Sequence, residues 1–263
     1  MFQPPLPSLR ITHRDGTKES FNADKINRSI ERAAVGLFDP ISKVIQVATE
    51  TQLTLYDGIT TQEMDEATIN AAIQNVKDDP EYDKIATRLL LKTVYKRILG
   101  DYGDNFENLE KKHKEFFSTY IETGVKEGRL DKRMIEKFDL EKISSAIDIS
   151  RDELFLYAGL SGLLNRYAIK NSKQEPIETP QYFFMRVAMG LSYNEEDPTL
   201  QAKKFYNKMS RMDFIAGGSC NLGAGTTRPA LSNCYLLQVE DDMEHIAKSV
   251  SDVMILSKNS GGL

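Results

Sequence analysis

Apolar residues recur along the first hundred residues with a spacing that predicts a β-hairpin followed by helices. Strand-like runs over residues 8–13 and 17–21 flank Asp15-Gly16, and Asp-Gly between such runs is a strong hairpin signal. Later segments place apolar residues about 3.6 positions apart, the period of an α-helix. Their apolar positions are Ile26, Ile30, Ala33 and Leu37, then Ile41, Val44, Ile45 and Ala48, then Ile69, Ala72, Ile73 and Val76, and finally Ile85, Leu89 and Val94.

Turn and capping residues mark the ends of these four predicted helices. Asn22 stands at the N-cap position of the first helix. The turn at residues 56–58 ends the second, and Thr60 with Glu63 has the form of a capping box that opens the third. Pro80 opens the fourth, because proline is favoured in the first turn of a helix. A hairpin with four short helices makes a complete small domain.

The pattern stays helical as far as residue 212 and changes after Phe214. Apolar spacing predicts helices over 106–123, 140–147, 179–191 and 200–212, with a short strand pair around 166–170 and 175–178. A glycine-rich stretch over 216–225 then precedes a strand-like run over 233–239 and a helix over 243–257. This order is typical of the opening β-α unit of an α/β domain. Because one such unit cannot form a stable sheet alone, we expect the chain to be the front of a larger protein.

Composition narrows the class of protein. The net charge of −5 is spread over mixed acidic and basic residues, which argues against a general binder of nucleic acid or membrane surfaces. No stretch is long and apolar enough to span a bilayer. Two cysteines make no disulfide framework, and no CxxC pair suggests zinc, so we expect a cytoplasmic protein without a metal site.

Two groups of residues could carry chemistry. His13 and Arg14 at the hairpin tip, with Lys25 and Lys96, could surround a polyphosphate beside a helix N-terminus, or they could be a solvated charged surface. Cys234 is either an inert apolar residue or a reactive thiol. A carboxylate such as Asp241 at a strand end can hold a ribose hydroxyl, or can simply cap the next helix.

Residues 11–26, 55–61 and 80–89 resemble an ATP-cone, the allosteric nucleotide-binding domain of ribonucleotide reductases. The resemblance implies that ATP or dATP binds here as an allosteric effector. His13 stands where this family commonly has a lysine. The implied effector-binding residues are His13, Arg14, Glu19, Asn22, Lys25, Thr61 and Lys96.

Residues 180–190, 224–237 and 256–262 are similar to the large subunit of class I ribonucleotide reductase. The resemblance implies that Cys234 is one member of the redox-active cysteine pair, whose partner lies on a later strand. It places Asn233 at a substrate-contacting position and Asp241 at the specificity-effector site of the dimer interface. The resemblance assigns no redox role to Cys220.

The resemblance also implies a fold. We expect a mainly α protein with an ATP-cone over 1–104, made of a β-hairpin plus a four-helix bundle. A helical domain should follow over 105–220. Residues 221–263 should hold the first β-α unit of an incomplete ten-stranded α/β barrel.

The implied function is reduction of ribonucleoside diphosphates to deoxyribonucleotides for DNA synthesis. The implied partners are the C-terminal segment of the large subunit, a small subunit whose metal generates the radical, thioredoxin or glutaredoxin, and a second large subunit. Two cysteines are too few for a thiyl radical, a redox pair and a shuttle pair, so we expect the chain alone to be inactive. A stand-alone nucleotide sensor and a fragment of a cobalamin-dependent class II reductase remain alternatives.

Overall fold

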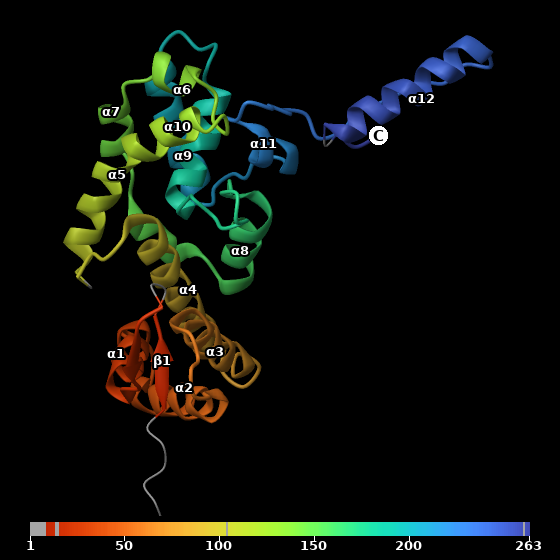
Figure 1. The fold of residues 1–263 in the computed structure, drawn as a ribbon. Helices are drawn as coiled ribbons and strands as arrows, with labels where there is room; N and C mark the ends of the chain where they lie inside the picture. The colour runs from red at the N-terminus through yellow and green to blue at the C-terminus, as the bar shows by residue number, and fades with distance from the viewer. Residues whose placement is uncertain (1–8, 14–15, 104, 260) are drawn as a thin grey trace, which may run out of the picture. The chain divides into compact units, whose positions relative to one another are not determined.

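The protein is mainly helical, with one β-hairpin near its start (Figure 1). The computed structural model describes residues 9–13, 16–103, 105–259 and 261–263. The chain divides into two compact units. Unit 1 comprises Met1–Tyr95 and Phe155–Leu160, and unit 2 comprises Lys96–Leu154 and Ser161–Leu263.

The hairpin of unit 1 forms as predicted. Strand β1 (Arg10–Thr12) pairs in antiparallel register with β2 (Lys18–Ser20), and Ile11 stands opposite Glu19. The outer edge of β1 is also paired, because the amide of Thr12 donates to the carbonyl of Ile59 at 2.9 Å. Thr12 and Thr60 make a parallel bridge there. The segment before the third helix is therefore held against the hairpin.

The four predicted helices of unit 1 are present. They are α1 (Ala23–Ala33), α2 (Pro40–Thr54), α3 (Thr61–Gln74) and α4 (Tyr82–Leu99). The predicted caps are confirmed: the side chain of Asn22 accepts from the amide of Asp24, and Thr60 with Glu63 forms the capping box. The apolar faces of α1, α3 and α4 meet in one buried core.

The predicted apolar face of α2 is wrong in part. Ile41 and Ile45 are 72% and 61% exposed. Lys43 is buried instead, and its ammonium donates to the carbonyl of Phe38 at 2.6 Å and pairs with Asp79 at 2.8 Å and Glu81 at 3.0 Å. These bonds turn the Lys43 side of α2 inward, so the isoleucine side faces outward.

Unit 2 is built around the buried helix α9, against which α10 packs; α5, α7 and α10 also lie together (Figure 1). Every residue from Pro180 to Gly190 in α9 is buried.

The middle of the chain, across both units, is helical. Its helices are α5 (Phe106–Lys126), α6 (Arg133–Glu136), α7 (Leu140–Ser145), a 3-10 helix (Ile149–Leu154), α8 (Tyr157–Gly162), a π-helix (Leu163–Tyr167), α9 (Pro180–Leu191) and α10 (Pro198–Ser210).

The C-terminal part of unit 2 differs from the prediction. The glycine-rich stretch contains a short helix, α11 (Gly218–Gly223). The strand predicted over 233–239 is reduced to one parallel bridge, between Cys234 and Gly262. Helix α12 (Met243–Lys258) forms as predicted, but Ser249 is its only buried residue. A strand needs paired neighbours, and the described residues supply one bridge rather than a sheet.

The second predicted strand pair is likewise reduced. Lys170 and Pro176 form an isolated antiparallel bridge, and Arg166 lies in the π-helix rather than in a strand. None of the helices in the described ranges is both long and apolar enough to cross a membrane.

Candidate nucleotide and thiol sites

Glu19 of β2 links two of the predicted effector-binding side chains. Its carboxylate lies 2.7 Å from the ammonium of Lys25 and 3.3 Å from Nε2 of His13. The hydrogen bond from Lys25 lowers the pKa of Glu19 below its usual value. All three side chains are partly exposed. They therefore form a polar cluster between the hairpin and α1 that an anionic ligand could reach.

Two helix N-termini adjoin this hairpin. Helix α1 follows β2 directly, and Asn22 caps it by accepting from the amide of Asp24 at 2.9 Å. Helix α3 begins at Thr61, next to the bridge between Thr12 and Thr60. The first amides of a helix have no intrahelical acceptor and carry partial positive charge, which favours anions. The arrangement combines these amides with the Lys25 cation.

Helix α4 carries Lys96 in its last turn. On the same helix, Arg88 donates to the carbonyls of Ala33 and Val35, and Lys92 donates to Ser29 at 2.6 Å. Lys96 follows Lys92 by one turn and so lies on the same face of α4. The boundary between the two units falls just before Lys96, and Arg14 lies outside the described residues.

Asn233 and Cys234 face opposite sides of their segment. The side-chain oxygen of Asn233 accepts from the amide of Ser219 in α11 at 2.7 Å. Gly262 pairs with the residues on both sides of Cys234. Its amide donates to the carbonyl of Asn233 at 2.7 Å, and its carbonyl accepts from the amide of Tyr235 at 2.9 Å. A Cβ on Gly262 would lie 3.9 Å from the Cys234 sulfur. The exposed thiol is thus on the Gly262 side, and the amide on the α11 side.

Cys220 occupies a different environment. It lies in α11, and its thiol donates to the carbonyl of Leu231 at 3.1 Å. Partial burial raises the pKa of this thiol, which lowers its reactive thiolate fraction. The two cysteines are both free. Because Cys234 points away from the α11 side, the geometry favours a partner other than Cys220.

Asp241 does not cap α12. The side chain of the next residue, Asp242, accepts from the amide of His245 at 3.0 Å and fills the N-cap position. Asp241 is exposed beside it. Of the two interpretations of Asp241, simple capping is therefore wrong. No group of three or more potential ligands that could hold a metal ion occurs among the described residues.

Sequence reasoning missed a buried ion pair that holds the end of α11. Arg186 of α9 and Glu178 are both fully buried, 2.6 Å apart. Arg186 also donates to the carbonyls of Asn221 and Ala224 at the end of α11. Burial alone would lower the pKa of Arg186, but Glu178 raises it overall. The available signal was that Arg186 is the one charged residue within Pro180–Leu191.

Comparison with known proteins matches two stretches of the chain. Residues 9–97 match the ATP cone domain, and residues 153–229 match the all-alpha domain of ribonucleotide reductase. The combination defines a protein in which an ATP-cone precedes the helical domain of a ribonucleotide reductase.

Proteins that match nearly the whole chain point to the same family. The chain is 34% identical to the ribonucleoside-diphosphate reductase subunit alpha of Chlamydia trachomatis serovar D over 97% of its length, which is 24% of that relative. It is 32% identical to the alpha subunit of Helicobacter pylori strain 26695 and 30% identical to the large subunit of Caenorhabditis elegans, covering 31% and 32% of them. The chain therefore belongs to the ribonucleotide reductase large subunits, corresponds to their N-terminal portion, and spans about a quarter to a third of these relatives.

Proposed function

We propose that this chain supplies the allosteric ATP-cone and the N-terminal helical part of a class I ribonucleoside-diphosphate reductase. The observation that carries the proposal is the polar cluster that His13 and Glu19 of the hairpin form with Lys25 of α1, next to two helix N-termini. A triphosphate needs cations and backbone amides together, and this surface combines both.

In this proposal, ATP and dATP bind the ATP-cone as activity effectors. Lys25 and His13 lie nearest to the phosphates, and Asn22 and Thr61 line the helix N-termini. Glu19 orients Lys25 through its 2.7 Å hydrogen bond. Arg14 and Lys96 complete the site, although Arg14 lies outside the described residues. The domain divisions at residues 104 and 220 belong to the same proposal.

The thiol of Cys234 acts in the proposal as one half of the redox pair. The exposure of Cys234 supports access by a second thiol. Two thiols are then oxidised to a disulfide as the ribose loses its 2′ hydroxyl as water. The side chain of Asn233 contacts substrate once its hydrogen bond with the amide of Ser219 is broken. Asp241 holds the deoxyribose of the specificity effector. Residues 221–263 would begin the ten-stranded barrel.

The proposed partners are those of the whole enzyme. They are the remainder of the large subunit, a small subunit whose metal generates the radical, thioredoxin or glutaredoxin, and a second large subunit. The cytoplasmic location expected from the sequence is part of this proposal.

Calorimetric titration of the 263-residue chain with dATP tests the nucleotide site. Lys25→Ala should weaken dATP binding by about tenfold or more, because it removes a charge-assisted contact with phosphate. Lys84→Ala is the matched control, since Lys84 is an exposed lysine of α4 near the opposite end of the helix from Lys96. Equal affinities for both variants and the parent chain would disprove the assignment.

A further inference from the structure

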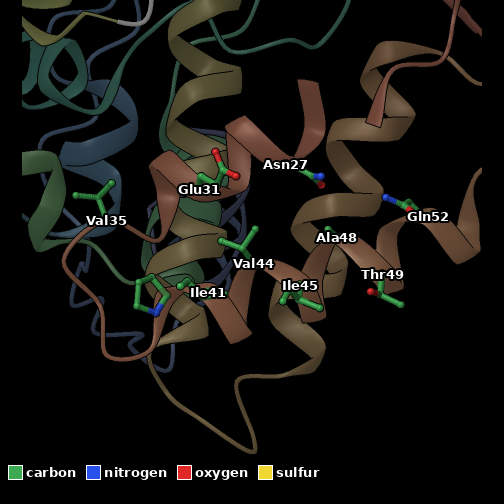
Figure 2. A pocket seen from close by; sticks show the side chains of 10 residues that line it. Asn27, Glu31, Val35, Ile41, Val44, Ile45, Ala48, Thr49 and Gln52 are labelled. Carbon is green, nitrogen blue, oxygen red and sulfur yellow. The ribbon is translucent and has the colours of Figure 1, made fainter. Parts of the chain in front are cut away.

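Unit 1 has a groove between α1 and α2 that the nucleotide site does not use. It has a volume of about 580 Å³. Its apolar wall consists of Val35, Pro40, Ile41, Val44, Ile45 and Ala48. We refer to it as the α1/α2 groove. Figure 2 shows Val35 and Ile41 toward one end, and Asn27 and Gln52 toward the other.

The apolar side chains of this groove are unusually open to solvent. Val35 is 66% exposed, Ile41 72% and Ile45 61%. The two isoleucines remain exposed because Lys43 fixes the opposite side of α2 toward the core. Contiguous exposed apolar side chains of this kind mark interaction sites rather than ordinary surface. Ile41, Val44, Ile45 and Ala48 are spaced as one stripe along α2, which suits a helical ligand.

The polar residues of the groove specify the chemistry of that ligand. The side-chain oxygen of Asn27 is buried and has no hydrogen-bond partner among the described residues. Glu31, one turn further along α1, is the only charged side chain among the described residues that line the groove. An acceptor and a carboxylate side by side require donors and positive charge from whatever covers them.

We propose that the α1/α2 groove binds an amphipathic helix of a partner protein, with aliphatic residues on one face and a lysine or arginine beside them. The distance along α2 from Ile41 to Gln52 corresponds to roughly 16 Å, about three helical turns. The aliphatic residues fill the space above Val44 and Ile45. The basic side chain donates to Glu31 and to Asn27.

Two other occupants fit less well. A nucleotide would bring phosphates to a groove that no basic residue lines within the described part of the chain. A symmetric second copy, groove against groove, would bring the same lining to both sides, and the described lining holds no lysine or arginine to pair with either Glu31. A basic amphipathic helix satisfies the acceptors and covers the aliphatic stripe together.

A pair of helical peptides tests the proposal with the full 263-residue chain. Both are alanine-rich, about four turns long, with leucines on one face and either a lysine or a glutamate beside them. Fluorescence anisotropy should show the lysine peptide binding about tenfold more tightly than the glutamate peptide. Glu31→Gln should bring the two affinities to within about twofold, because the charge that distinguishes them is gone.

A matched pair of surface variants localises the binding. Ile45→Asp should abolish binding of the lysine peptide, whereas Leu53→Asp should not, since Leu53 is an exposed residue of α2 that does not line the groove. Circular dichroism checks that both variants remain folded. The proposal is overturned if the peptides bind equally to the parent chain, or if neither binds. It is also overturned if sedimentation shows a dimer that Ile45→Asp dissociates.

Discussion

Individual charged side chains decide which surfaces of this protein are buried. Lys43 is buried because it has two carboxylates and a carbonyl within hydrogen-bond distance. Arg186 is fully buried because Glu178 and backbone carbonyls satisfy it. Burying a charge without such partners would cost several kcal/mol of folding free energy. That cost is on the order of the net stability of a whole domain. Removing Glu178 alone would therefore be far more damaging than removing an exposed partner such as Glu19.

His113 of α5 should make the stability of unit 2 depend on pH. Burial lowers its pKa from 6.5 to about 4, while the Leu109 carbonyl 3.1 Å from Nδ1 acts in the opposite direction. The unfolded chain therefore binds more protons between these pH values. Stability is full above pH 6.5 and falls as the pH drops toward 4. Urea unfolding should show a loss of about 1 kcal/mol between pH 7.5 and 5.5.

Two histidine substitutions test whether His113, rather than another titrating group, causes this pH dependence. His113→Phe keeps a ring against Tyr182, which it meets edge-on at 5.5 Å, and should remove most of that pH dependence. His245→Gln, at a partly exposed position of α12, should leave it intact. An unchanged slope in His113→Phe would show that another group is responsible.

At the level of elements, close backbone contact fixes α9 against the segment after α11. A Cβ on Gly190 would lie 2.1 Å from the amide nitrogen of Gly225 and 2.5 Å from the carbonyl carbon of Ala224. Arg186 holds the same segment through the Ala224 carbonyl. The segment cannot move away without breaking a buried hydrogen bond, so only glycine fits at position 190.

Two alanine substitutions in unit 2 should have opposite effects. Gly190→Ala should destabilise the protein by about 1–3 kcal/mol through overpacking. Gly162→Ala meets no atom within 4 Å and has helical angles, φ −60° and ψ −43°, so it should stabilise by up to about 1 kcal/mol. Urea midpoints of the two variants measure both. Equal midpoints would contradict the close contact.

At the level of the whole molecule, the proposed function gives this chain regulation and one thiol of the reductase. With the small subunit alone, these 263 residues should convert no CDP to dCDP. In enzyme reconstituted with the remainder of the large subunit, Cys234→Ser should abolish repeated turnover with thioredoxin, because no disulfide can form. Cys220→Ser should retain activity to within about twofold, since its thiol is partly buried and bonded to Leu231. Product analysis by chromatography measures both, and equal loss in the two variants would contradict the role of Cys234.

The sequence by itself determined the local structure of unit 1. The Asp-Gly pair, the Asn22 cap and the capping box at Thr60 are patterns of residues close in the chain, so they predicted the hairpin and the helix starts. It also determined family membership, because the matching motifs occur in order along the chain.

Only the tertiary structure decided which side of each element is buried and which candidate residues meet. Ile45 was predicted to face the core, yet contacts of Lys43 with the distant Asp79 and Glu81 turned it outward. Asn233 and Cys234 are adjacent in sequence, yet contacts with Ser219 and Gly262 assign them to opposite sides. Such contacts join residues far apart in the chain, and local periodicity contains no information about them.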